Sequence, residues 1–345
     1  NLINISVYLK IGLKDSINIC FFVLSCADLT CVVMLGVQDV IAIFPESIQL
    51  VWRTDGLSLN FLVAFYYGAF YDVSQGITTF IAVQKCWCVA LPFRFKGTFT
   101  TARTAVIVAA VSVAALSMNL PVLSTQGLQE IMLPGANATL LLLWTAESRQ
   151  QIIPIVGLVS LIYTNTCQFT VIFCLVVLAS NLRASSKFRN SSTVSTVDPP
   201  ATSDLKIDNS KQNLMTDRLS CKKGTAGHRT ITGNRAGEIS TSGRKDIAPA
   251  PRRNKITSRK ELQAIKSTTF VSILFVSCNT FKLLNYYVIL CVPEYKLNGR
   301  FQNTYFLSNS CRIFLESLHI SLNMFVYLKF NTRFRSTLMS GCGTG

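Results

Sequence analysis

The sequence has little of what enzymes and metal proteins usually require. Only two of its 345 residues are histidines, and no two cysteines have the C-x-x-C spacing of a zinc site. No nucleophile stands in a recognisable arrangement with a general base. Most of the 12 cysteines lie inside apolar runs, where a thiol packs as a small hydrophobic group. We therefore expect neither an enzyme nor a zinc protein.

Charged residues are also scarce. They make up 14% of the chain, against about a quarter of a typical soluble domain, while 50% of the residues are hydrophobic. Several apolar runs are long enough to cross the hydrocarbon core of a bilayer, which takes about 20 helical residues. The composition therefore predicts an all-α membrane protein that is embedded in a lipid bilayer.

Acidic residues are the rarer charged type, and the formal net charge is +16. Most of the positive excess lies in the polar segment that begins near Arg183 and ends near Lys266. A basic segment between two apolar runs is typical of a cytosolic loop that faces anionic lipid or an acidic partner protein. It does not resemble the basic face of a folded nucleic-acid-binding domain, so we expect no nucleic-acid partner.

The apolar runs predict seven membrane-spanning helices followed by a short amphipathic eighth helix. Residues 1–13 are too short to span and are interpreted as a truncated first helix whose outer part is missing. The other six spans are expected at 17–44, 58–88, 104–123, 152–182, 259–293 and 305–330. They form one predicted domain over residues 1–340, with a disordered basic third intracellular loop at 183–258. Residues 331–345 are expected to form the amphipathic helix and tail.

The distribution of cations predicts how this domain is oriented in the membrane. Segments expected on the inner side carry Lys10, Lys14, Arg94, Lys96, Arg103, Lys329, Arg333 and Arg335. Segments expected on the outer side carry few: Arg53, Arg149, Lys296 and Arg300. Because cytoplasmic loops are enriched in lysine and arginine, we expect a multi-pass protein of the plasma membrane with its basic segments in the cytosol.

Four short motifs occur in a fixed order along the apolar runs. Leu24-x-x-x-Asp28 lies in the second run, and Gln84-Lys85-Cys86 ends the third and leads into a V-A-L-P loop that closes at Pro92. Phe275-x-x-Cys278-Asn279 lies in the sixth run, and Asn323-x-x-x-Tyr327 ends the seventh. In order and spacing these motifs resemble those of rhodopsin-like (class A) G-protein-coupled receptors, particularly divergent invertebrate receptors of the peptide or chemosensory type.

The resemblance implies a function and a set of sites. An extracellular ligand, a peptide or a chemosensory cue, would activate a heterotrimeric G protein through outward movement of the sixth helix. Asp28, Ser74, Asn323, Tyr327, Phe275 and Asn279 would form the activation switch. A sodium ion at Asp28 is the one cofactor that the resemblance suggests. Gln84, Lys85, Cys86 and Pro92 would contact the G protein.

Charged and phenolic residues inside the third and seventh runs are the candidates for ligand binding. They are Tyr67, Tyr71, Asp72, Arg312 and Glu316. An ionised side chain within a membrane must find a partner, and the spacing of Arg312 and Glu316 allows them to pair on one helical face. Lys282 in the sixth run must either extend outwards or meet a carboxylate. Interhelical hydrogen bonding without a ligand would explain the same residues.

Two modification sites are expected outside the bundle. Asn137 begins an N-x-T sequon on the expected outer side and is a glycosylation candidate, and Cys342 in the tail is a palmitoylation candidate. Asn60 stands where the receptor family has the cysteine that ties the third helix to the second outer loop. No cysteine lies between residues 125 and 150 either, so that disulfide is not expected.

Two other classes of protein stay open. The family has arginine where this chain has Lys85, and a lysine ammonium does not reproduce the bidentate guanidinium fork. A receptor-like seven-helix protein that does not couple to a G protein is therefore one alternative. A transporter is the other, although the sequence has no internal repeat of the kind that transporters show.

Overall fold

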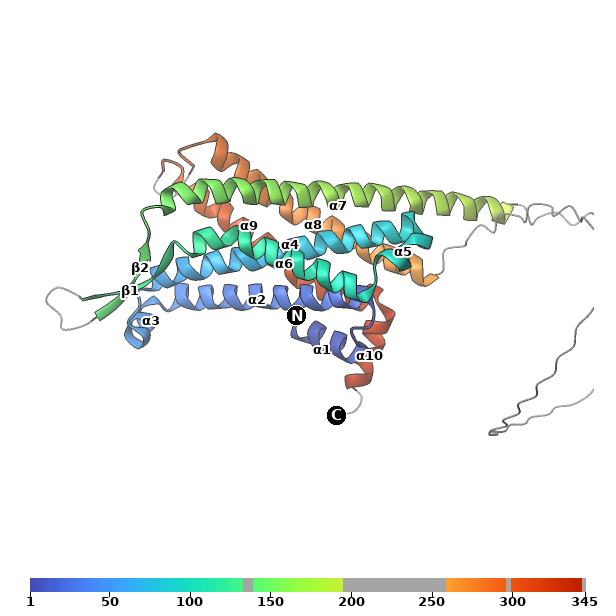
Figure 1. Cartoon of the computed structure of the whole chain (residues 1–345), viewed down its shortest axis with the longest axis horizontal. Helices are drawn as coiled ribbons and strands as arrows, with labels where there is room; N and C mark the ends of the chain where they lie inside the picture. Colours follow the sequence, from blue (N-terminus) through green and yellow to red (C-terminus); the bar gives the residue numbers. More distant parts are fainter. Residues whose placement is uncertain (133–138, 195–258, 296–298, 343–345) are drawn as a thin grey trace, which may run out of the picture. The chain divides into compact units, whose positions relative to one another are not determined.

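The computed structural model describes residues 1–132, 139–194, 259–295 and 299–342 (Figure 1). The chain divides into two units. The first comprises Asn1–Arg189 and Thr257–Gly345, and the second is Asn190–Ile256. Most of the predicted third intracellular loop, from residue 195 to 258, lies outside the described residues, whereas residues 183–194 continue the preceding helix.

Helices account for most of the described chain, and each predicted apolar run forms one of them. The long helices are α2 (Ser16–Ile43), α4 (Gly56–Ala90), α6 (Thr101–Leu123), α7 (Arg149–Val194), α8 (Arg259–Cys291) and α9 (Gln302–Phe330). The short ones are α1 (Leu2–Ile11), α3 (Pro45–Trp52), α5 (Pro92–Thr98) and α10 (Thr332–Cys342). Helices α3 and α5 occupy segments that were expected to be loops. Each has proline in its first turn, where the missing N–H costs nothing.

Four helices of the described residues are long and apolar enough to cross a membrane. They are α2, α6, the part of α7 from Arg149 to Asn181, and the part of α8 from Thr269 to Cys291. A fifth is added if α9 and α10, which meet at 87°, count as one broken span. Helix α4 has the length, but its buried polar residues make it less apolar. The described chain is therefore a multi-pass membrane protein with four to five candidate spans, and seven spans remain a prediction.

The prediction of an all-α chain needs one correction. Strands β1 (Gln126–Met132) and β2 (Thr139–Thr145) form an antiparallel pair in register from Gln126 opposite Thr145 to Met132 opposite Thr139. Strand β2 contains a leucine-rich apolar run, from Leu140 to Leu143. A short apolar run of this length fits a strand and a helical segment equally well, so its periodicity does not distinguish them.

Strand β2 is also attached to the start of α4. The backbone N–H of Leu141 donates to the carbonyl of Arg53 at 2.7 Å, and the N–H of Asp55 donates to the carbonyl of Leu141 at 3.1 Å. Asp55 is the N-cap of α4, and its Oδ2 accepts hydrogen bonds from the backbone N and the Oγ of Ser58, both at 2.8 Å. The connection between α6 and α7 is thus held by backbone bonds at the point where α4 begins.

Helix α4 is the central element of the bundle (Figure 1). It packs against α2, α6 and α8, and both strands contact it. We call the end of the bundle with α3, β1 and β2 the hairpin end, and the end with α5 and α10 the basic end. The basic end carries the cations that predicted the cytosolic side, including those of α10.

An aromatic cluster closes the basic end. The rings of Tyr8, Phe21, Tyr327 and Phe334 lie with centroids 4.8 to 6.0 Å apart, and they come from α1, α2, α9 and α10. Phe334 is fully buried, which anchors the first turn of α10 across the end of the bundle. A short helix is therefore present, as α10, at the position where the amphipathic helix was predicted.

Gly76 makes a testable contribution to the packing of α4. A Cβ atom at this position would collide with the hydroxyl of Tyr163 and lie 2.7 Å from Cγ1 of Val111, whereas a Cβ at Gly68 would meet nothing within 4 Å. We expect Gly76→Ala to lower the free energy of unfolding by about 1–3 kcal/mol through overpacking. The matched change Gly68→Ala should be neutral or stabilising by up to about 1 kcal/mol. Unfolding in mixed detergent micelles measures both, and equal effects would contradict the close approach.

Candidate functional site

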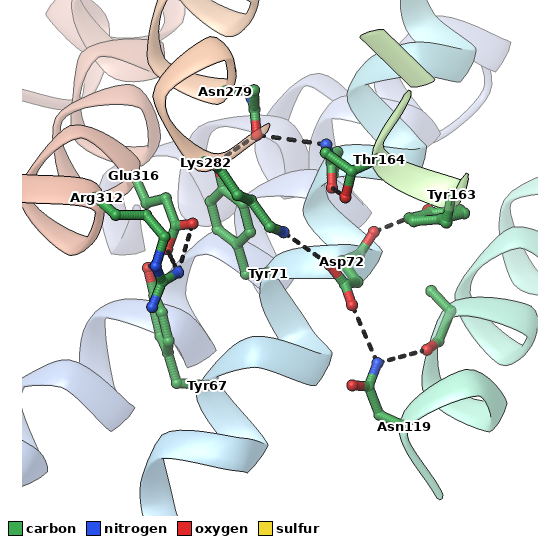
Figure 2. Close-up of polar contacts among 12 residues, drawn as sticks. Tyr67, Tyr71, Asp72, Asn119, Tyr163, Thr164, Asn279, Lys282, Arg312 and Glu316 are labelled. Carbon is green, nitrogen blue, oxygen red and sulfur yellow. Dashed lines mark hydrogen bonds and ion pairs between the residues drawn. The ribbon is translucent and has the colours of Figure 1, made fainter. Parts of the chain in front are cut away.

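A buried ion pair joins α4 to α8 in the half of the bundle nearer the hairpin end (Figure 2). Lys282 Nζ lies 3.1 Å from Asp72 Oδ1, and the two side chains are 4% and 5% exposed. Asn119 on α6 donates from Nδ2 to Asp72 Oδ2 at 3.1 Å. The hydroxyl of Tyr163 on α7 donates to the backbone carbonyl of Asp72 at 2.9 Å. Four helices therefore meet at Asp72.

The ion pair confirms one of the two outcomes predicted for Lys282, that it meets a carboxylate. Removing both charges from water is costly, and a buried pair is tolerated only when its geometry is good and further hydrogen bonds satisfy it. The Asn119 amide and the ring of Tyr71, whose centroid is 4.7 Å from Lys282 Nζ, supply these additional contacts.

Tyr71 continues the polar contacts towards the middle of the bundle. Its hydroxyl donates to Asn279 Oδ1 on α8 at 3.0 Å, and Gln75 Nε2 on α4 donates to the same oxygen at 3.3 Å. Thr164 on α7 donates to Gln75 Oε1 at 3.5 Å. Asn279 was predicted as a switch residue of the sixth helix, and the structure places it next to Tyr71, a predicted ligand contact.

A second ion pair lies on α9. Arg312 NH1 is 2.7 Å from Glu316 Oε1 and 2.8 Å from Glu316 Oε2, which confirms the predicted pairing along one helical face. The hydroxyl of Tyr67 on α4 donates to Glu316 Oε2 at 2.8 Å. Tyr67 and Tyr71 stack with ring centroids 6.1 Å apart, and so link the two pairs. We call Tyr67, Tyr71, Asp72, Lys282, Arg312 and Glu316 the ion-pair cluster.

A separate polar contact lies nearer the basic end. Ser74 on α4 donates to Asp28 Oδ1 on α2 at 2.5 Å, and Asn323 Nδ2 on α9 donates to Asp28 Oδ2 at 2.9 Å. All three side chains are buried. The structure thus brings together three residues of the predicted switch that are far apart in the sequence, and joins three helices through one carboxylate.

Several buried polar atoms of α9 have no protein partner among the described residues. Among the described residues, Asn323 Oδ1, both ring nitrogens of His319 and the hydroxyl of Tyr327 are buried and form no hydrogen bond. The oxygen donors of Asp28, Ser74 and Asn323 are of the hard type that sodium prefers, so the residues present fit the ion that the resemblance suggests. The described residues contain no cluster of three His, Cys, Asp or Glu side chains able to hold a metal.

The two other predicted switch residues lie in hydrophobic packing. Phe275 is fully buried, and its ring meets that of His319 edge-on at 5.6 Å. Tyr327 belongs to the aromatic cluster of the basic end. Packing therefore places both between helices, and neither makes a polar contact with Asp28.

Gln84 does not lie on the surface that we expected to face a G protein. Its side chain is fully buried, with Nε2 donating to Thr104 Oγ1 on α6 at 3.2 Å and Oε1 accepting from Cys20 Sγ on α2 at 3.5 Å. Lys85 and Cys86 are half-buried. Of the four residues in that prediction, Gln84 is therefore corrected to a packing residue of the bundle.

The side chains of three predicted residues lie outside the described part of the structure. Asn137 lies in the gap between β1 and β2, outside the described residues. Pro92 begins α5 and Cys342 ends α10, but their side chains are also outside the described part. The predictions for glycosylation, G-protein contact and palmitoylation at these positions remain predictions.

Sequence reasoning missed two partners of the site. Asn119 and Gln75 contact predicted residues but were not themselves predicted to belong to the site. Asn119 carried a usable signal, because it is an amide within a mainly apolar run and such a group needs a hydrogen-bond partner. Which helix supplies that partner depends on packing that the run itself does not specify.

Comparison with known proteins does not identify a family. No protein-family model matches the chain, and no curated protein matches it.

Proposed function

We propose that this chain is a seven-helix receptor of the rhodopsin-like type at the plasma membrane. It would convert binding of an extracellular ligand into activation of a heterotrimeric G protein. The single observation that supports this most is the contact of Asp28 with Ser74 and Asn323, because it reproduces in space the constellation that the motifs implied. The ion-pair cluster, nearer the hairpin end, would be the ligand site.

The two polar centres give the proposal a mechanism. A ligand shifts a conformational equilibrium only if it interacts differently with the two states. The ion-pair cluster connects α4 with α8 and α9, so a ligand that alters its bonds changes how those helices are held. Asp28 also joins α4 to α9, and a sodium ion bound there would favour the arrangement in which these oxygen atoms converge. Movement of α8 would then open the basic end to the G protein.

Nucleotide exchange by a panel of heterotrimeric G proteins tests the proposed function. The full chain is compared with Lys85→Ala and Lys85→Arg. Because hydrogen bonds to a charged group contribute about 1.5–3 kcal/mol, we expect Lys85→Ala to lower the exchange rate at least about tenfold. The matched control is Arg300→Ala, which removes an exposed cation from the opposite end of the bundle and should leave exchange unchanged.

One observation favours a second candidate, a receptor-like protein that no longer couples. None of the ion pairs among the described residues includes Lys85, and lysine lacks the guanidinium geometry expected at this position. A parent chain without exchange, combined with exchange in Lys85→Arg, would support lapsed coupling. If none of the three chains stimulates nucleotide exchange although each is folded at the cell surface, a non-signalling function would be supported.

A further inference from the structure

The carboxylates of the ion-pair cluster are already engaged. Asp72 Oδ1 accepts from Lys282 and Oδ2 from Asn119. Glu316 Oε1 accepts from Arg312, and Oε2 accepts from both Arg312 and Tyr67. All four carboxylate oxygens therefore have a donor. A cationic ligand entering the cluster would have to displace one of these donors.

The cations have hydrogen-bond donors to spare. A lysine ammonium has three N–H groups, and within the described part of the chain Lys282 Nζ donates to one oxygen, that of Asp72. Its other neighbours are the rings of Tyr71 and Tyr286, with centroids at 4.7 and 6.0 Å. A ring face attracts the cation but is a weaker acceptor than an anionic oxygen.

Arg312 shows the same surplus. Of its five N–H groups, two on NH1 face Glu316, while Nε and one N–H of NH2 are directed to Asn309 Oδ1. The remaining NH2 donor is free of a hydrogen bond to the described residues. The Arg312 side chain is also 21% exposed, whereas that of Glu316 is not exposed at all. The accessible member of this pair is thus the cation.

From this imbalance we propose that the ligand of the ion-pair cluster is an organic acid. Its carboxylate would accept hydrogen bonds from the spare N–H groups of Lys282, and Arg312 would be a second anchor (Figure 2). The stacked rings of Tyr67 and Tyr71 would pack against the apolar part of the acid. The carboxylate belongs either to a free small acid or to a peptide. That this binding triggers signalling rests on the proposed function, but the binding itself does not.

Direct binding to the full chain in nanodiscs of zwitterionic lipid, without a G protein, tests the proposal. The probes are 4-phenylbutyrate, 4-phenylbutanamide and 4-phenylbutylamine, which share one apolar group and differ in charge. We expect the acid to bind at least tenfold more tightly than the amide, and the amine to bind no better than the amide. Equal affinity for all three, or preference for the amine, would overturn the proposal.

Substitutions then locate the acid. Asp72→Asn removes the anion that competes for Lys282 and should tighten binding of 4-phenylbutyrate several-fold. The double variant Asp72→Asn with Lys282→Met carries no unpaired buried charge, so it should stay folded and lose the preference for acid over amide. A double variant that keeps this preference would overturn the role of Lys282. If Asp72→Asn changes thermal stability but not acid affinity, the pair is structural only and the proposal fails.

Two further measurements separate the source of the acid and the role of binding. A tetrapeptide ending in phenylalanine is compared with its C-terminal amide, and acid-selective binding of the peptide alone assigns the carboxylate to a peptide. Selective binding of 4-phenylbutyrate alone assigns it to a small acid. Acid-selective binding with no nucleotide exchange would refute the proposed function and leave this inference standing. Nucleotide exchange without acid-selective binding would refute this inference and leave the proposed function standing.

Discussion

Lys282→Met is expected to lower the free energy of unfolding by about 3–5 kcal/mol. The substitution leaves the Asp72 carboxylate buried, with the neutral Asn119 amide as the remaining side-chain donor among the described residues. An unpaired charge in a low-dielectric interior is far more costly than the pair that it came from. Unfolding of the purified chain in mixed detergent micelles, followed by circular dichroism, measures the loss.

Two controls separate the effect of charge from the effect of side-chain size. Asp72→Asn combined with Lys282→Met removes both charges and should recover most of the lost stability. Arg333→Met breaks the ion pair between Arg333 and Asp15, in which the two side chains are 62% and 65% exposed. This substitution should lower the free energy of unfolding by about 1 kcal/mol or less. Were Lys282→Met as mild as Arg333→Met, the Asp72 charge would have another partner or would not be buried as described.

Arg312→Met and Glu316→Gln are expected to differ strongly, although they break the same ion pair. Without Arg312, the Glu316 carboxylate is buried with Tyr67 as its remaining donor among the described residues, so a loss of about 3–5 kcal/mol is expected. Without the Glu316 charge, Arg312 retains the oxygen of Asn309 and a partly exposed guanidinium. Glu316→Gln should therefore cost no more than about 1–2 kcal/mol.

The same unfolding measurement resolves this asymmetry. Tyr67→Phe is the matched control, because it removes one donor to Glu316 and leaves both charges in place, with an expected cost of about 1 kcal/mol. Equal losses for Arg312→Met and Glu316→Gln would show that Arg312 is as poorly hydrated as Glu316. That outcome would also weaken the inference that the cation is the accessible member of the pair.

The apolar runs predicted the helices well because long hydrophobic segments have few alternatives to a helix in a membrane. The run predicted at 305–330 corresponds to α9, which begins a few residues earlier, at Gln302, and ends at Phe330. The run at 152–182 was less well bounded, since α7 continues through polar residues to Val194. Hydropathy marks where a chain meets lipid, but it does not mark where a helix ends.

Spacing along one helix was also sufficient for local contacts. Arg312 and Glu316 are four residues apart, and they pair as that spacing predicts. Contacts between helices were harder to predict, because they depend on which faces the packing brings together. Lys282 had two acceptable outcomes in the sequence, and the approach of α8 to α4 selects the pair with Asp72.

Gln84 shows most clearly that the sequence of one helix does not predict which of its side chains are buried. Its position beside Lys85 at the end of an apolar run suggested an exposed residue at the basic end. The side chain instead points towards Cys20 and Thr104, and its amide forms hydrogen bonds with both inside the bundle. Neighbours in sequence on a helix point about 100° apart, so adjacent polar residues need not share a surface.

The attachment of β2 to the start of α4 has a practical consequence. Leu141 is held by backbone hydrogen bonds to Arg53 and Asp55, and no cysteine lies between residues 125 and 150. The anchorage of this segment is therefore insensitive to thiol reductants. The protein can therefore be handled in reducing buffer without loosening the connection between α6 and α7. The reductant keeps the cysteines from forming unwanted disulfides.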